Sequence, residues 1–148
     1  MHSTNEFFAS QVLLPQKLIF TKFLRPVVHE EYKEAMLYVY EIIKTKRLEN
    51  WVMVSTISDF TMQDQKWSVE HLGLLLQDTP LKKVAMVRDH DAILQLVAES
   101  MRSKIYRIFG TNKELQHFAT MREALSFLLP DTDPDQLLLK LKQVKVRS

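Results

Sequence analysis

The run Trp51-Val52-Met53-Val54-Ser55-Thr56-Ile57 decides the fold, because it is a near-continuous series of strand-forming residues. Such a run is expected in the middle of a sheet whose two faces are covered by helices. Thr61 follows it, and the apolar spacing predicts a helix from about residue 62 to 77. The same order of strand, polar joint and helix recurs at residues 84–91 and 115–120. This repetition predicts an α/β fold.

Two extended segments precede this run and predict an N-terminal hairpin. Phe7–Leu14 and Leu18–Leu24 are separated by Pro15-Gln16-Lys17. Because apolar side chains fall on both faces of the second segment, we expect it to be an interior strand. From Val28 to Arg47 the apolar spacing is three and four, which predicts an amphipathic helix. The fold class is therefore a single-domain mixed sheet with an N-terminal hairpin followed by βα units, with helices packed on the sheet.

Polar pairs mark where helices begin. Thr61 with Asp64 forms a variant of the capping box, and Thr120 with Glu123 forms a regular one. Residues 89–91 are expected to cap one more helix, which runs to about residue 102 or 106. Gly73 lies inside a predicted helix, where glycine costs about 1 kcal/mol relative to alanine. We therefore expect it to mark a close approach between two elements.

The segment Pro130-Asp131-Thr132-Asp133-Pro134 divides the chain into a domain at residues 1–130 and a C-terminal tail at residues 131–148. Asp133 suits a cap and Pro134 suits the first helical position, so the tail is predicted to be helical. Its apolar stripe consists of Leu137, Leu138, Leu141 and Val144. The favoured interpretation is packing on its own domain or on a second copy, and a membrane-surface helix is the alternative. The stripe is a candidate partner-binding surface.

The composition excludes several classes of protein. The 148 residues suit one domain, and the net charge of +2 comes from mixed rather than clustered charges, which disfavours nucleic-acid binding. The chain has no cysteine, so disulfides, a thiol nucleophile and thiolate-bound metals are excluded. No stretch approaches the roughly 18 apolar residues of a membrane span, and no secretion signal is recognisable. We therefore expect a cytoplasmic protein.

No motif in the sequence indicates a particular enzymatic reaction. The five histidines are scattered, without the spacing of a metal site, and the two glycines cannot form a nucleotide-binding loop. The serine-nucleophile turn of hydrolases is also missing. We therefore predict no cofactor and no metal, and no enzymatic activity.

A candidate ligand-binding crevice remains at the carboxyl ends of two predicted strands, where open α/β sheets bind ligands. The residues at these ends are Ser58, Asp59, Thr61, Arg88, Asp89 and His90. If the two strands are neighbours, the two aspartates, the arginine and the histidine lie together at one edge of the sheet. The alternative is that these residues only cap helices and end strands.

The order of motifs resembles a bacterial branch of the STAS-like group, the SpoIIAA-like proteins. The residues that carry the resemblance are Phe20, Phe23, His29-Glu30-Glu31-Tyr32, Ala35-Met36, Trp51, Asp59, Asp64-Gln65-Lys66-Trp67, Lys82-Lys83-Val84-Ala85-Met86-Val87, His117-Phe118 and Glu123-Ala124-Leu125-Ser126-Phe127-Leu128. Phosphorylated members carry a serine in an Asp-Ser-x-Gly segment at the start of the second helix. Here that place holds Thr61-Met62-Gln63-Asp64-Gln65, without the serine or the glycine. Other relatives are thought to bind small apolar or anionic ligands.

Three functions follow as hypotheses. The first is a non-enzymatic regulatory or protein-binding module that meets a protein partner or a second copy of itself. The alternative is a carrier or sensor for a small ligand, with lipid-like molecules included. The third is an enzyme using Asp59, Asp89 and His90 for acid–base chemistry, which requires the two strand ends to be adjacent.

Overall fold

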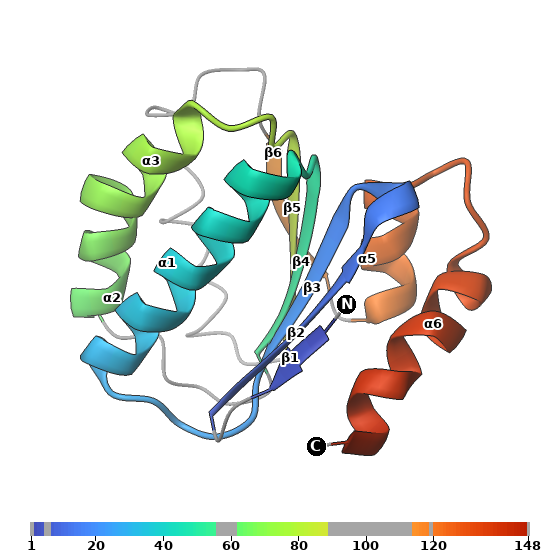
Figure 1. Ribbon diagram of the computed structural model, residues 1–148, viewed down its shortest axis with the longest axis horizontal. Helices are drawn as coiled ribbons and strands as arrows, with labels where there is room; N and C mark the ends of the chain where they lie inside the picture. Colours follow the sequence, from blue (N-terminus) through green and yellow to red (C-terminus); the bar gives the residue numbers. More distant parts are fainter. Residues whose placement is uncertain (1, 5–6, 56–61, 89–113, 119, 148) are drawn as a thin grey trace.

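The computed structural model describes residues 2–4, 7–55, 62–88, 114–118 and 120–147, which form a sheet covered by helices on both faces (Figure 1). The strands are β1 His2–Thr4, β2 Phe8–Leu13, β3 Leu18–Phe23, β4 Asn50–Ser55, β5 Lys83–Arg88 and β6 Glu114–Phe118. The helices are α1 His29–Lys46, α2 Met62–Trp67, α3 Gly73–Gln77, α5 Met121–Leu128 and α6 Pro134–Arg147. The predicted mixed α/β fold class is confirmed.

The strands of the described sheet lie in chain order, from β1 to β6. β1, β2 and β3 are antiparallel, and β3 to β6 are parallel. The predicted hairpin is β2 and β3, joined by a 3-10 turn at Leu14–Gln16 and by Lys17, which has a left-handed φ of 51°. β1 was not predicted, because its three residues are polar and pair at one edge only. The predicted helix after residue 91 lies outside the described residues.

β3 and β4 are interior strands, as predicted, and their side chains enter two separate hydrophobic clusters. Ile19 and Trp51 face the layer of α1, α2 and α3, whereas Phe20 and Val52 face the layer of α5 and α6. This alternation follows from the period of two along a strand. The described side chains of these strands therefore contribute to one hydrophobic cluster on each face of the sheet.

The helix from Met62 to Gln77 contains a π-helical turn at Ser68–Leu72, where the Gly73 N–H donates to the Ser68 carbonyl five residues earlier. Its buried stripe is Asp64, Ser68, Leu72 and Leu76. Twelve residues of α-helix turn by about 1,200°, so residues spaced by four drift about 120° from one face. The wider π turn offsets part of this drift. The sequence predicts the helix but not this local unwinding.

α5 begins at the predicted capping box. The Thr120 hydroxyl accepts from the Glu123 N–H at 3.2 Å and donates to the Glu123 carboxylate at 2.9 Å. Ala124, Leu125 and Leu128 of this helix are buried. The helix thereby covers β5 on the second face of the sheet.

α6 confirms the helical tail, and its Asp133 side chain accepts from the Asp135 N–H at 3.0 Å. Leu137 and Leu141 are buried in the cluster of the second face, and Leu138 is partly buried against it. The Val144 side chain lies outside the described side chains. The division of the chain at residue 130 stays a prediction. None of the helices in the described ranges is long and apolar enough to cross a membrane.

Candidate functional site

The predicted crevice meets its condition on strand order. β4 and β5 are parallel neighbours, with Ser55 opposite Arg88, so their carboxyl ends lie at the same edge of the sheet. Arg88 is the last residue of β5. The other five candidates, Ser58, Asp59, Thr61, Asp89 and His90, lie outside the described residues. The crevice and the enzyme hypothesis therefore stay predictions.

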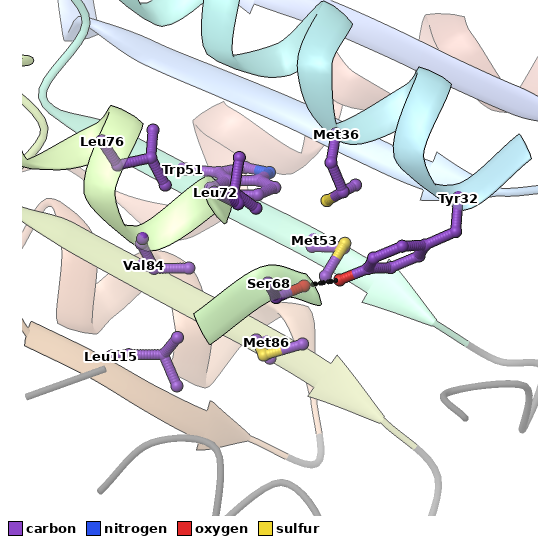
Figure 2. A pocket seen from close by; sticks show the side chains of 11 residues that line it. Tyr32, Met36, Trp51, Met53, Ser68, Leu72, Leu76, Val84, Met86 and Leu115 are labelled. Carbon is purple, nitrogen blue, oxygen red and sulfur yellow. Dashed lines mark hydrogen bonds between the residues drawn. The ribbon is translucent and has the colours of Figure 1, made fainter. Parts of the chain in front are cut away.

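A cavity lies between the first helical layer and the sheet, and the structure describes all of its lining residues (Figure 2). It is lined by Tyr32 and Met36 of α1, Ser68, Leu72, Gly73 and Leu76 of the 62–77 helix, and Trp51, Met53, Val84, Met86 and Leu115 of the strands. Its volume is about 30 Å³. This is room for about one water molecule, and the lining is almost entirely apolar.

Three methionines line the cavity, and their side chains allow its walls to rearrange easily. Met36, Met53 and Met86 enter it from α1, β4 and β5, and each is at most 4% exposed. A methionine side chain is unbranched and has three rotatable bonds, so it can fill irregular gaps and repack around a guest. The cavity can therefore widen by side-chain rotation as well as by movement of the helix above it.

One polar pair contributes to the lining. The Tyr32 hydroxyl and the Ser68 hydroxyl are 2.6 Å apart in a buried hydrogen bond between α1 and the π turn (Figure 2). The Trp51 indole N–H donates instead to Thr21 on β3 at 3.0 Å. Tyr32 and Ser68 are thus the side chains that present polar atoms on the helical side of the cavity.

A second polar contact joins the same two helices. His29 Nδ1 lies 2.6 Å from a carboxylate oxygen of Asp64, whose side chain is 1% exposed. Asp64 was predicted to cap its own helix with Thr61, which is outside the described residues. In the described structure its carboxylate is held by α1, one helical turn from the Tyr32–Ser68 pair.

The start of α1 is fixed by another ion pair. The Arg25 guanidinium donates to both Glu31 carboxylate oxygens, at 2.8 and 3.1 Å, and the Val28 N–H donates to the same carboxylate at 3.1 Å. The Arg25 hydrogen bonds, followed by the Val28 amide, hold the pKa of Glu31 below its ordinary value of 4.5. This pair orients the helix that carries His29 and Tyr32.

A groove of about 310 Å³ lies at the opposite end of the parallel strands. Glu49, which lines the groove, lies between Lys17 at 3.2 Å and Lys82 at 3.4 Å. The hydrogen bond from Lys17 is the largest cause that lowers the pKa of Glu49. The Lys83 ammonium donates to the Phe127 carbonyl at 3.0 Å. Both lysines that line this groove, Lys82 and Lys83, thus have a partner within the chain.

Tyr32 and Met36 lie in the amphipathic helix predicted from Val28 to Arg47, and the cavity beneath them was not predicted. Gly73 was the available signal, because a buried glycine in a helix leaves space that a side chain would fill. Among the described residues, no group of three or more histidines and carboxylates is placed to hold a metal ion.

No protein-family model matches the chain, and no curated protein matches it. Among solved structures, the chain is similar to an uncharacterised protein of the DUF3478 family from Shewanella loihica, which has a SpoIIAA-like fold. The match has a TM-score of 0.52 and 19% sequence identity, and it covers 85% of this chain and 98% of that chain. The chain therefore has a SpoIIAA-like fold, and the expected resemblance is confirmed at the level of the fold.

Proposed function

We propose that this chain is a non-enzymatic binding module of the STAS type that carries or senses a small apolar molecule. The observation that carries this proposal is the methionine-lined cavity beneath the π turn. Its lining is apolar apart from the Tyr32–Ser68 pair. A cavity of this kind favours a guest with an apolar body and at most one hydrogen-bonding group.

Binding requires the cavity to expand. At about 30 Å³ it is far below the roughly 300 Å³ of an ordinary ligand pocket. Three methionines repack at low cost, and π-helical turns are rare interruptions of α-helices that frequently lie at functional sites. We therefore propose that the described state is the contracted one, and that a guest makes room by displacing the Ser68–Leu72 turn from the sheet.

The test uses N-phenyl-1-naphthylamine, an uncharged apolar probe whose fluorescence rises on leaving water. We expect saturable binding to the purified protein. The variant Val84→Phe places a larger side chain at a lining position and should weaken binding at least several-fold. Val87→Phe is the matched control, because Val87 lies on the same strand but enters the core on the opposite face. Equal loss in both variants, or no saturable binding by the unaltered chain, contradicts the proposal.

A protein partner is the second candidate function, and exposed leucines on the helical layer favour it. Leu37 of α1 is 42% exposed and Leu74 of α3 is 55% exposed. Large apolar side chains at such exposure are common at protein interfaces but also occur singly on ordinary surfaces. Capture of a stoichiometric partner from the native host, lost in the variant Leu37→Ser with Leu74→Ser, supports this function. Undiminished capture by the double variant removes the leucines from consideration.

A further inference from the structure

We infer that the guest of the cavity is an uncharged apolar molecule whose one polar group is a carbonyl, as in a ketone or an ester, and that this group binds the Tyr32–Ser68 hydroxyl pair. The inference rests on the proposed function, because it assigns a class of ligand to the same cavity. The two hydroxyl oxygens are 2.6 Å apart, and both residues are 2% exposed. A carbonyl that reaches this pair is therefore shielded from water.

The two hydroxyl groups of the lining lie together at one side of the cavity. Figure 2 shows them pointing toward each other, with Leu76 on the opposite side of the lining from Tyr32. Ser68 and Leu76 are eight residues apart along one helix, which corresponds to about 12 Å along its axis. A guest can therefore place its apolar body near Leu76 and its polar group at Ser68.

The hydroxyl pair has one proton to donate to a guest. Two hydroxyl groups carry two protons, and the hydrogen bond between them uses one. A phenol is a stronger donor than an aliphatic alcohol, so Tyr32 donates and Ser68 accepts. The Ser68 proton is then left for the guest, since Tyr32 is the one hydrogen-bond partner of the Ser68 hydroxyl among the described residues. A buried donor is costly to leave without an acceptor, and a carbonyl oxygen supplies one.

The lining of the cavity disfavours an ionised guest. All of its residues are described, and none of them is a lysine, an arginine, a histidine, an aspartate or a glutamate. A carboxylate that enters loses its water without gaining a cation, and the burial of an unpaired charge is strongly unfavourable. A ketone or an ester loses less on leaving water and regains a hydrogen bond at the pair. The ligand class is therefore uncharged.

Three naphthalenes of similar size test this class. 2-Acetylnaphthalene is a ketone, 2-isopropylnaphthalene is its hydrocarbon counterpart, and 2-naphthoate is an anion. Each competes with N-phenyl-1-naphthylamine for the purified protein, and the ratio of ketone affinity to hydrocarbon affinity is compared between variants, so that the difference in hydrophobicity cancels. We expect Tyr32→Phe with Ser68→Ala to lower this ratio about three- to ten-fold, the effect of one hydrogen bond. Displacement by 2-naphthoate as strong as by the ketone overturns the inference.

A second tyrosine–serine pair on the same helix gives a matched control. The Ser10 hydroxyl of β2 donates to the Tyr38 hydroxyl of α1 at 3.4 Å, and neither residue lines the cavity. Tyr38→Phe with Ser10→Ala removes the same atoms and should leave the ratio unchanged. Because both partners of each hydrogen bond are replaced, no unpaired group remains, and both double variants should fold, as circular dichroism verifies. An equal fall of the ratio in the two double variants overturns the inference.

Infrared spectra of the unaltered chain give a second measurement, which does not depend on the folding of a variant. The carbonyl band of bound 2-acetylnaphthalene should lie at a lower wavenumber than in hexane, because a hydrogen bond weakens the carbonyl double bond. A bound-state band at the hexane position overturns the inference. If neither the ketone nor the hydrocarbon displaces the fluorescent probe, the proposed function itself fails. If both displace it and the ratio is unchanged in Tyr32→Phe with Ser68→Ala, the inference alone fails.

Discussion

His29 Nδ1 and the Asp64 carboxylate, 2.6 Å apart, connect the first turn of α1 to α2. Tyr32, three residues after His29, bonds to Ser68, four residues after Asp64. Residues three or four apart lie on the same face of a helix. The two pairs therefore join one face of α1 to one face of the 62–77 helix at two successive turns. These two hydrogen-bonded pairs hold the π-helical turn over the cavity, so their strength determines how readily the cavity opens.

Removing the charge of the buried Asp64 carboxylate should weaken the attachment of the 62–77 helix to α1. In Asp64→Asn the short charge-assisted hydrogen bond is replaced by a neutral one, and we expect the free energy of unfolding to fall by about 2 kcal/mol. The measurement is urea denaturation followed by circular dichroism. Binding of N-phenyl-1-naphthylamine should become tighter, because less free energy is needed to displace the helix.

His29→Ala and the double variant complete a mutant cycle. A coupling of about 1 kcal/mol or more between positions 29 and 64 is expected for two groups in direct contact. Additive effects of the two substitutions contradict the assigned interaction. Glu70→Gln serves as the control, because Glu70 is an exposed carboxylate on the same helix, and its removal should leave both stability and probe binding nearly unchanged.

A methyl group at position 73 should raise the stability of the fold and lower its affinity for the probe. Gly73 is buried, has helical φ and ψ of −57° and −43°, and lines the cavity. Gly73→Ala should therefore raise the free energy of unfolding by up to about 1 kcal/mol through helix propensity. The same methyl occupies space that a guest needs, so probe affinity should fall. A variant that binds the probe as well as the unaltered chain contradicts the placement of the guest beside Gly73.

The strands and helices could be predicted because each is specified locally. The apolar run at 51–57 predicts an interior strand on composition alone, and Thr120 with Glu123 predicts the start of a helix through two bonds within one turn. The cavity could not be predicted in this way. Tyr32 and Ser68 are 36 residues apart in the sequence, and their contact exists only once α1 and the π turn share one face of the sheet.

The π turn and the Arg25 ion pair show the same limit. A stripe with spacing of four fits an α-helix well enough to predict one, and nothing in that spacing indicates the π-helical turn at Ser68–Leu72. Arg25 is an ordinary charged residue in the sequence, and it acquires its role from the loop that brings it to Glu31. Local pattern thus gives the elements, whereas the site depends on how they are brought together.

Acidification should destabilise the fold through Glu31 and Glu49. Both carboxyls have a pKa held below the ordinary value of 4.5 in the folded protein, chiefly by hydrogen bonds from Arg25 and Lys17 respectively. The unfolded chain therefore binds protons first as the pH falls below about 4.5, which favours unfolding. This stabilisation is complete above the unfolded pKa and is lost as the pH falls through the folded pKa values.

Two substitutions test that assignment. In Arg25→Gln the Glu31 carboxyl loses its cation, and in Lys17→Gln the Glu49 carboxyl keeps only Lys82, so stability should depend less steeply on pH below about 4.5. Thermal unfolding at a series of pH values measures the slope. Lys33→Gln is the control, because Lys33 pairs only with the highly exposed Glu30 at 3.5 Å among the described ion pairs. If the stability of the Lys33→Gln control depends on pH as weakly as that of the two test variants, the result contradicts the roles assigned to the two ion pairs.

Truncation after Thr132 tests the expected division between the domain and its tail. The shortened chain lacks α6 and exposes the seats of Leu137 and Leu141, whose burial contributes about 2 kcal/mol per side chain. Hydration of Gln11 of β2, whose amide nitrogen donates to the Lys140 carbonyl of α6 and whose Oε1 atom is buried without a donor in the described part of the chain, offsets part of that loss. A net cost of about 3 kcal/mol is smaller than the stability of an ordinary domain, so the truncated protein should fold, with a lower urea midpoint and near-native circular dichroism. A truncated chain that is unfolded in the absence of urea means that α6 belongs to the folding unit itself, and the boundary at residue 130 is then wrong.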